Sequence, residues 1–401
     1  MDLTFIINNW EFFLFILFLT LFLIYYRKNL DLVGLFPFFY MLLYKTTWGL
    51  KQMDSWSKKH PKVFLYLGYF SFFIGVIGLF FSLIFMVWQL FFIVENQLTS
   101  GGGFVLPLQT ESGMQGSIPI FHVPFIYWII SLFVLAVVHE FAHGVIGQRF
   151  KIKVKSSGFA FAGVIAPILP AAFVEPDEES YKKAKKWQQI SMLGAGSTSN
   201  LLFGLLFLLM LIFVASPLVD KTTQIESINF YGISEQSYLA NYNISSGEIL
   251  KVNDIEEKEE IIRYFSQLKP NENISMLINS DGKINEYSIV TFENDLDSQR
   301  GMIGIIGIDI VTTNKDGFWY LGSICEVFAI LLFWLSLLNI GIGIMNLLPL
   351  WITDGGKILY TLLSYKLSNE MSGIISSFIS LFTFIIIIFS LWPSLLYSIF
   401  L

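Results

Sequence analysis

The sequence has few charged residues and almost no cysteine. Only 14% of its 401 residues are charged, whereas soluble globular chains carry about 25%. The single cysteine, Cys325, excludes an internal disulfide framework and any zinc site built from several cysteines. It lies in an apolar run, which is typical of a small buried side chain. The net charge of −6 gives no indication of nucleic-acid binding, so we expect no nucleic acid among the partners.

Hydrophobic residues dominate instead, at 54% of the chain, and aromatic residues alone make up 17%. The few charged residues gather in short stretches between apolar runs that are long enough to cross a bilayer. The composition therefore excludes an ordinary soluble enzyme. It predicts an integral, multi-pass membrane protein that has the lipid bilayer as its surroundings.

Most of the apolar runs have the length and the lack of charge of membrane spans. They cover about Trp10–Tyr26, which we interpret as a retained anchor, and then Val63–Val94, Ile120–Gly147, Ile190–Val214, Phe318–Leu348 and Ser372–Trp392. Leu32–Tyr44 is shorter and contains Pro37, so we expect an interfacial or re-entrant piece there. Gly158–Val174 is interrupted by glycine and proline, which predicts a hairpin or loop that dips into the bilayer.

Positive residues near the ends of the spans set the expected orientation. Lysines between positions 45 and 62, and the basic cluster at 149–155, predict cytoplasmic loops. The segment 95–119 has no lysine or arginine and is expected outside, whereas the mixed-charge stretch 175–189 predicts a short cytoplasmic helix. With these crossings, both chain ends and the polar segment after Pro217 lie outside the cell. Abundant Phe, Ile, Asn and Lys favour a prokaryotic cell membrane.

The strongest local signal is the sequence His139-Glu140-Phe141-Ala142-His143, an H-E-x-x-H pattern inside an apolar run. On a helix, positions i and i+4 lie on the same face, so both imidazoles can reach one metal ion. Glu140 between them is placed to take a proton from an attacking water. The alternative is that these residues only fill a helix. An ionisable group in a membrane span is costly, however, and needs a partner or a function. The pattern therefore favours a zinc site.

Two histidines do not complete such a site, because catalytic zinc is held by three protein ligands. A candidate third ligand is Asp354, which follows an apolar span and the helix-breaking Pro349. Gly355 and Gly356 allow the backbone to turn tightly after it. The alternative makes Asp354 the N-cap of a helix that begins near Lys357. Beside an H-E-x-x-H sequence that lacks a ligand, metal binding is the better interpretation.

The segments H-E-F-A-H and N-L-L-P-L-W-I-T-D-G-G resemble the hallmark motifs of the site-2 protease family of intramembrane metalloproteases. Between them, Leu193–Asn200 resembles a third family motif, which usually reads A-G-P followed by an asparagine. Ser197 stands here where the family has proline, whereas the asparagine is kept as Asn200. The similarity covers about residues 120–365 and includes the order of the motifs.

The resemblance implies a role for each matching residue. His139, His143 and Asp354 would bind one zinc ion (Zn2+) per chain, and Glu140 would be the general base. Asn200 would assist substrate or oxyanion binding, with helix–helix hydrogen bonding as the alternative. The implied activity is hydrolysis of a peptide bond within or next to a transmembrane segment of a membrane-protein substrate, in regulated intramembrane proteolysis. The active site is expected towards the cytoplasmic side.

A polar segment separates the last membrane spans from the earlier ones. From about Asp220 to Asp316 it alternates short apolar runs with turn signals such as Asp281-Gly282, and it has the length of one small soluble domain. A helix is expected near 257–268, with strands near 274–278 and 287–291.

Within this segment, Ser246–Asp254 resembles the G-D-x-I-x-x-x-N-G sequence of PDZ domains found in such proteases. Glu248 replaces the usual aspartate and Asp254 the usual glycine. The resemblance implies a PDZ-like domain, which can bind an extended peptide as an added strand. A rigid cap without a ligand is the alternative.

The expected fold is a polytopic α-helical membrane protein with about six transmembrane helices, a re-entrant segment and one small inserted PDZ-like α+β domain. Residues 1–119 would form N-terminal membrane segments with an extracytoplasmic loop, and 120–218 the first part of the protease core. Residues 219–316 would form the extracytoplasmic domain, and 317–401 the second part of the core.

Two other functions fit polar residues inside a membrane protein. A catalytically silent relative that binds membrane partners through the PDZ-like domain would have no need to keep Glu140. A metal transporter would be expected to spread its polar ligands along a path, whereas the candidate ligands here converge on one site. The protease interpretation is therefore preferred.

Overall fold

The computed structural model describes residues 7, 9–35, 39–96, 102–107, 120–163, 167, 169–234, 237–242, 244–294 and 297–393. The chain divides into two compact units. The first, called the membrane unit, combines Met1–Met210 with Ile330–Leu401, and the second, called the strand-rich unit, is Leu211–Ala329. The strand-rich unit covers more residues than the predicted polar segment 219–316, because it includes the end of one long helix and the beginning of another.

Five helices of the described residues are long and apolar enough to cross a membrane. They are α4 (Pro61–Glu95), α5 (Phe125–Arg149), α7 with its continuation (Lys186–Thr222), α10 (Leu321–Met345) and α12 (Asn369–Leu391). Helix α2 (Trp10–Tyr25) has 16 residues and is about 24 Å long, less than the roughly 30 Å of a hydrocarbon core. The multi-pass α-helical architecture is therefore confirmed, with five full-length spans in the described part of the chain.

The shorter helices connect or flank these spans. They are the 3-10 turn η1 (Arg27–Asn29), α3 (Leu50–Lys59), α6 (Glu178–Lys183) and α11 (Asp354–Leu363). Helix α7 proper (Lys186–Met210) passes through a π-helical turn at Leu211–Ala215 into α8 (Ser216–Thr222). Pro217 lacks the N–H of a regular α-helical hydrogen bond, which accounts for the wider turn just before it.

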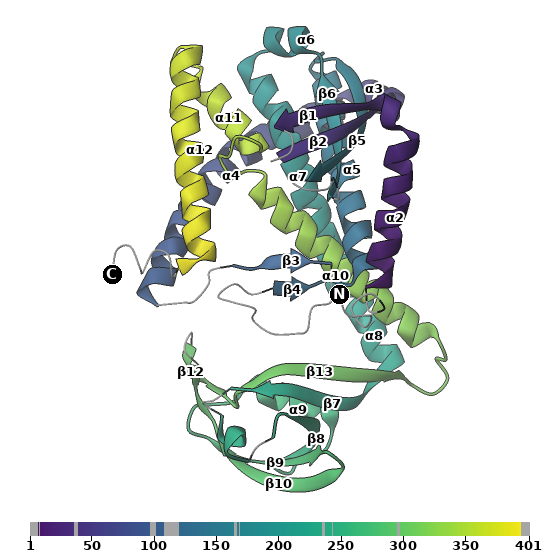
Figure 1. The fold of residues 1–401 in the computed structure, drawn as a ribbon, viewed down its shortest axis with the longest axis vertical. Helices are drawn as coiled ribbons and strands as arrows, with labels where there is room; N and C mark the ends of the chain where they lie inside the picture. Colours follow the sequence, from purple (N-terminus) through teal and green to yellow (C-terminus); the bar gives the residue numbers. More distant parts are fainter. Residues whose placement is uncertain are drawn as a thin grey trace. The chain divides into compact units, whose positions relative to one another are not determined.

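A four-stranded antiparallel sheet lies beside the helices of the membrane unit (Figure 1). Its strands, in the order β1-β2-β5-β6, are β1 (Leu30–Leu35), β2 (Phe39–Thr46), β5 (Val154–Gly163) and β6 (Leu169–Pro176). The hairpin predicted for Gly158–Val174 is therefore present as β5 and β6. Leu32–Tyr44, predicted as an interfacial or re-entrant piece and not a full span, contributes β1 and β2, which pair with each other and extend the same sheet. Pro37 lies outside the described residues.

Two predicted segments begin or end differently in the structure. Glu175 belongs to β6, so the helix predicted for Glu175–Gln189 is in fact α6 followed by the start of α7. The side chain of Asp177 caps α6 by accepting a hydrogen bond from the Ser180 N–H at 2.9 Å. The span predicted from Ile120 begins at Phe125, because Ile120–His122 forms strand β4, parallel to β3 (Phe104–Leu106).

The strand-rich unit is built on a five-stranded antiparallel sheet in the order β10-β9-β8-β7-β13. Its elements are β7 (Thr223–Ile233), the 3-10 turn η3 (Tyr238–Tyr242), β8 (Ser246–Val252), α9 (Lys258–Phe265), β9 (Asn273–Ser280), β10 (Lys283–Val290), β11 (Phe292–Asn294), β12 (Asp297–Met302) and β13 (Ile305–Asn314). The predicted helix and strands of this segment are confirmed. Asp281 and Gly282 have φ values of 52° and 75°, as a two-residue turn between β9 and β10 requires.

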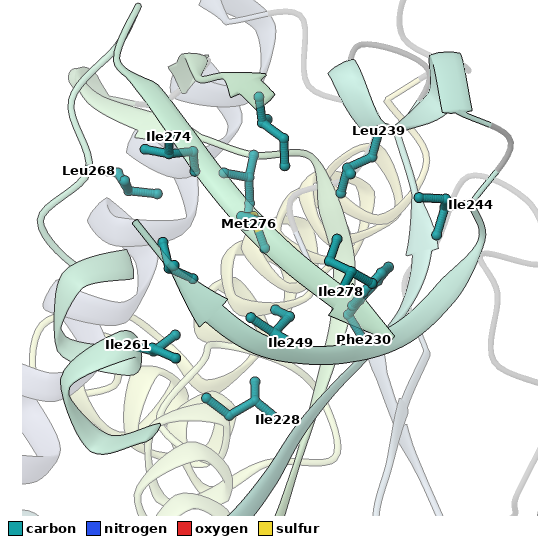
Figure 2. Close-up of a cluster of buried hydrophobic side chains, with 13 residues drawn as sticks. Ile228, Phe230, Leu239, Ile244, Ile249, Ile261, Leu268, Ile274, Met276 and Ile278 are labelled. Atoms are coloured by element: carbon teal, nitrogen blue, oxygen red, sulfur yellow. The ribbon is translucent and has the colours of Figure 1, made fainter. Parts of the chain in front are cut away.

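The core of this unit is formed by apolar side chains from both the sheet and the helix (Figure 2). Ile228 and Phe230 of β7, Ile249 of β8 and Met276 of β9 are almost completely buried, and α9 adds Ile261. In β9 the buried residues alternate along the strand, so one face of the sheet is apolar. The segment therefore has its own hydrophobic core.

Candidate metal centre

Helix α5 brings the two histidines of the H-E-x-x-H sequence to one point. Their spacing puts both rings on the same face, and His139 Nε2 lies 3.0 Å from His143 Nε2. Both side chains are buried, because this face of α5 packs against α7. Helix α7 packs against both α5 and α11 in the membrane unit.

The carboxylate of Asp354 reaches the same point from α11. Its Oδ2 lies 3.2 Å from His139 Nε2 and 3.0 Å from His143 Nε2. Thr353, not Asp354, is the N-cap: its Oγ1 accepts a hydrogen bond from the Gly356 N–H at 3.3 Å. The alternative that Asp354 caps a helix beginning near Lys357 is therefore wrong, and the Asp354 side chain is available to bind a metal ion.

Tight backbone packing before α11 fixes the position of Asp354. The Gly355 N–H donates to the Asn346 carbonyl at 2.8 Å, which ties the start of α11 to the end of α10. A Cβ on Gly355 would collide with the Leu347 carbonyl, and one on Gly356 with the Leu350 carbonyl. Both glycines are therefore required by close contact with backbone atoms, which larger residues cannot make.

The hydrogen-bond partners of the two imidazoles indicate which nitrogens face inward with a lone pair. His143 Nδ1 lies 2.6 Å from the Met192 carbonyl oxygen, which can only accept, so Nδ1 carries the proton. His139 Nδ1 lies 3.1 Å from the side-chain amide of Asn200. With the amide turned so that Oδ1 faces the ring, Oδ1 accepts a hydrogen bond from the Nδ1–H, which is the tautomer that leaves Nε2 free to bind a metal ion. Both Nε2 atoms then present lone pairs.

Three lone-pair atoms thus face one another in a buried space. Among the described residues, Asp354 Oδ2 has no hydrogen-bond donor of acceptable geometry, and such a cluster is unfavourable unless a cation lies between its members. In a tetrahedral zinc site with bonds of roughly 2.0–2.1 Å, ligand atoms are about 3.3 Å apart, close to the observed separations of 3.0–3.2 Å. The three residues therefore fit a zinc ion.

Glu140, the predicted general base of the H-E-x-x-H sequence, lines a cavity next to these ligands. The ligand atoms of His139, Glu140 and His143 all lie within 4.8 Å of one another. The cavity has a volume of about 670 Å³ and is also lined by Asp354 and Lys357. Lys357 Nζ lies 3.3 Å from Asp354 Oδ1, so it holds the second carboxylate oxygen away from the histidines.

Several of the other residues that line this cavity are polar but uncharged. They include Gln189, Thr361, Ser376 and Ser380 from three helices, with Tyr181 of α6. Burial raises the pKa of the Tyr181 hydroxyl to about 12, so this group remains neutral. Such a lining can hold water beside Glu140 inside a membrane protein.

Sequence reasoning missed Gly196, which packs directly against the histidines. A Cβ at this position of α7 would lie 2.5 Å from His139 Nε2 and would also collide with His143 Nε2. Any side chain there would therefore occupy the space of the ligand atoms. The run Leu193-Gly194-Ala195-Gly196 gave a signal, because small residues allow close contact between membrane helices. Thr353 could likewise have been predicted as an N-cap, because threonine is favoured at the position just before a helix begins.

The structure gives Asn200 a position behind His139. Asn200 is fully buried and contacts Nδ1, on the opposite side of the ring from the ligand atoms. This contact crosses from α7 to α5, so it is also the helix–helix hydrogen bond considered as the alternative. The contact can hold the His139 ring in place, and Asn200 is not among the residues that line the cavity with Glu140.

We expect Asn200→Ala to weaken zinc binding by about 10- to 100-fold, because His139 loses the acceptor that fixes its tautomer and orientation. Asn200→Asp keeps an acceptor at the same place and should bind zinc nearly as wild type does. Competition with a chelating zinc dye measures both affinities. Asn339→Ala is a matched control, since Asn339 is equally buried and donates only to the Leu335 carbonyl of its own helix. Equal losses in Asn200→Ala and Asn339→Ala would contradict the positioning role.

Comparisons with known proteins agree with this geometry. The family model described as Peptidase family M50 matches residues 127–389, which include all of the candidate ligands. An uncharacterized protein of Methanocaldococcus jannaschii is 28% identical over 241 residues, covering 58% of this chain. The chain thus matches 56% of the length of that relative.

Proposed function

This chain belongs to peptidase family M50, the site-2 protease family, and on that premise we propose that it is an intramembrane zinc endopeptidase. Its substrates would be membrane proteins, cut within or next to a transmembrane segment in regulated intramembrane proteolysis. The observation that carries this proposal is the convergence of His139, His143 and Asp354 beside Glu140, on helices of a multi-pass membrane protein.

A zinc ion held by the three ligands would act as a Lewis acid that makes water nucleophilic near neutral pH and polarises the scissile carbonyl. Glu140 takes the proton of the attacking water as its oxygen bonds to the carbonyl carbon. Glu140 then passes this proton to the leaving nitrogen while the C–N bond breaks. The products are a carboxylic acid and an amine, and Glu140 is again a carboxylate.

The substrate must reach Glu140 in an extended form, because a helix hides its carbonyls in backbone hydrogen bonds. An unwound segment inside a membrane needs other partners for its backbone groups. Strand β6 offers such partners, since it pairs only with β5 among the described strands and its other edge is unpaired. Phe173 and Val174 of β6 line the cavity that contains Glu140. We infer that the unwound substrate pairs with β6 beside the catalytic residues.

The strand-rich unit would act outside the membrane as a PDZ-like domain. Its sheet has two edge strands, β10 and β13, and an extended peptide can be added to such an edge. We propose that this unit lies on the extracytoplasmic side and senses or excludes substrates. The active site would open towards the cytoplasm, and the basic residues after α5 support a cytoplasmic position for the end of that helix.

The test of this function uses a membrane-protein substrate with an altered transmembrane segment. Two central leucines replaced by glycine should raise the cleavage rate about tenfold, because each glycine lowers the cost of unwinding the helix. Cleavage is measured with purified enzyme and substrate in liposomes, with and without a zinc chelator. A pair of leucine-to-alanine replacements is the matched control and should leave the rate nearly unchanged. Equal rates for glycine and alanine substrates would exclude unwinding as a requirement, and cleavage that resists chelation would exclude the zinc mechanism.

A further inference from the structure

A second polar cavity of the membrane unit lies away from the metal centre. It has a volume of about 530 Å³ and lies where the first turns of α4, the end of α5, helix α6 and the first turn of α7 meet. Arg149, Lys151 and Lys183 line it, and none of the lining residues is acidic. Three cations around one concave space favour an anionic ligand.

The three cations have few competing partners within the described residues. Arg149 uses its Nε to donate to the Pro61 carbonyl at 2.8 Å, which fixes the guanidinium and leaves its two Nη groups for other acceptors. Lys183 pairs with Glu179 at 3.3 Å, but both side chains are largely exposed and such a pair is weak. Lys151 is exposed and makes no ion pair with any described residue.

The backbone also directs Lys151 to this place. Lys151 follows the end of α5 with a φ of 64°, a left-handed conformation that usually belongs to glycine or asparagine. A lysine at this position keeps a positive charge at the rim of the cavity. Trp187 and Gln188, in the first turn of α7, bring the positive end of a helix dipole to the same cavity.

Aromatic rings form the apolar part of the cavity at the level expected for lipid headgroups. Tyr69 stacks on Trp187 with ring centroids 5.2 Å apart, and Phe150 meets Trp187 edge-on at 5.0 Å. Tyrosine and tryptophan are enriched at this depth in membrane proteins. The cavity therefore combines phosphate-binding cations with rings that suit the glycerol and upper acyl region of a lipid.

An exposed apolar stripe continues from the cavity along α4. Tyr69, Phe73 and Ile77 are spaced at i, i+4 and i+8, so they share one face, and all three are exposed. This face points to the surroundings of the membrane unit, where lipid chains would cover it. A free phosphate ion would use the cations but neither the rings nor this stripe.

We propose that this cavity binds the headgroup of an anionic phospholipid, whose acyl chains lie along the exposed face of α4. The phosphate is held by Arg149, Lys151 and Lys183 at the basic end of the membrane spans. The lipid then bridges α4, α5, α6 and α7, and of these α5 carries the H-E-x-x-H residues and α7 carries Asn200. The site is separate from the catalytic residues and does not depend on the proposed protease activity.

The experiment is native mass spectrometry of the full chain in a non-ionic detergent, titrated with phosphatidylglycerol or with phosphatidylcholine of the same acyl chains. We expect phosphatidylglycerol to bind at least about tenfold more tightly. Each cation is expected to contribute about fivefold to the ratio of the two affinities. The double variant Lys151→Gln/Lys183→Gln should therefore bind the two lipids about equally. The double variant Lys182→Gln/Lys185→Gln removes two lysines near the cavity that do not line it, and should keep the preference.

Two further measurements make the outcome decisive. Lys183→Gln alone changes only an exposed helical side chain, so this variant will fold. Its preference for phosphatidylglycerol over phosphatidylcholine should fall about fivefold. Inorganic phosphate at millimolar concentration should not displace phosphatidylglycerol. Equal binding of the two lipids, an unchanged preference in Lys151→Gln/Lys183→Gln, or displacement by inorganic phosphate would each overturn the proposal, the last by showing a site for soluble anions.

Discussion

Replacing Glu140 with glutamine is expected to lower kcat about 10³-fold or more while the protein keeps its zinc. Glutamine has nearly the same shape as glutamate but cannot take a proton from water at neutral pH. Glu140 contributes none of the three ligand atoms that lie within 3.2 Å of one another, so its replacement leaves the metal ligands in place. Single-turnover cleavage in liposomes, beside metal analysis of the same sample, measures both properties.

The matched control for this variant is Glu326→Gln. Glu326 is also a glutamate in a membrane-spanning helix, α10, but it does not line the cavity that contains Glu140. Its replacement should leave kcat within a factor of about two, because distant substitutions act independently. A Glu140→Gln protein that still cleaves at the wild-type rate would remove Glu140 from the mechanism and transfer the role of base to another group.

The second large effect is expected from Asp354→Ala, which should reduce bound zinc from about one ion per chain to nearly none. The two imidazoles that remain would leave a buried metal ion with two protein ligands. The same substitution removes the carboxylate that Lys357 contacts at 3.3 Å, so an uncompensated ammonium faces the cavity. Metal analysis after dialysis against a weak chelator measures the loss, with Asp309→Ala, an exposed aspartate of the strand-rich unit, as the control.

Gly196→Ala tests the same centre without removing any polar group. The added methyl group would lie 2.5 Å from His139 Nε2, so the ring must move and the three ligand atoms can no longer converge. Gly373→Ala is the matched control, because a Cβ there meets no atom within 4 Å. Full zinc content in both Asp354→Ala and Gly196→Ala would show that the metal is bound elsewhere in the protein.

The two kinds of variant separate binding from chemistry. Asp354→Ala and Gly196→Ala should lose zinc and activity together, whereas Glu140→Gln should lose activity alone. A catalytically silent relative would show no activity in wild type and no difference between these proteins. The pattern across the set therefore distinguishes the protease from a protein that only binds membrane partners.

Several features of this protein were determined by the sequence alone, because they depend on local geometry. Hydropathy located the long helices, since a span needs about 20 apolar residues in a row. The i, i+4 spacing put His139 and His143 on one face of α5. The turn at Asp281-Gly282 followed from residues that accept positive φ values. Each of these signals lies within a few residues of the feature that it predicts.

Other features were decided only by the tertiary structure. Leu32–Tyr44 was expected as an interfacial or re-entrant piece, and no local pattern shows that a distant strand, β5, pairs with it. Asn200 was expected either to assist substrate or oxyanion binding or to hydrogen-bond between helices, and only the packing of α7 on α5 shows that it contacts His139. Gly196 and the Met192 carbonyl lie beside the histidines because α7 packs on α5. The run of small residues in α7 indicates a close helix contact, but it does not show which residues of another helix lie there. The sequence thus determined which chemical groups are present, whereas packing between helices decided which of them meet at one point.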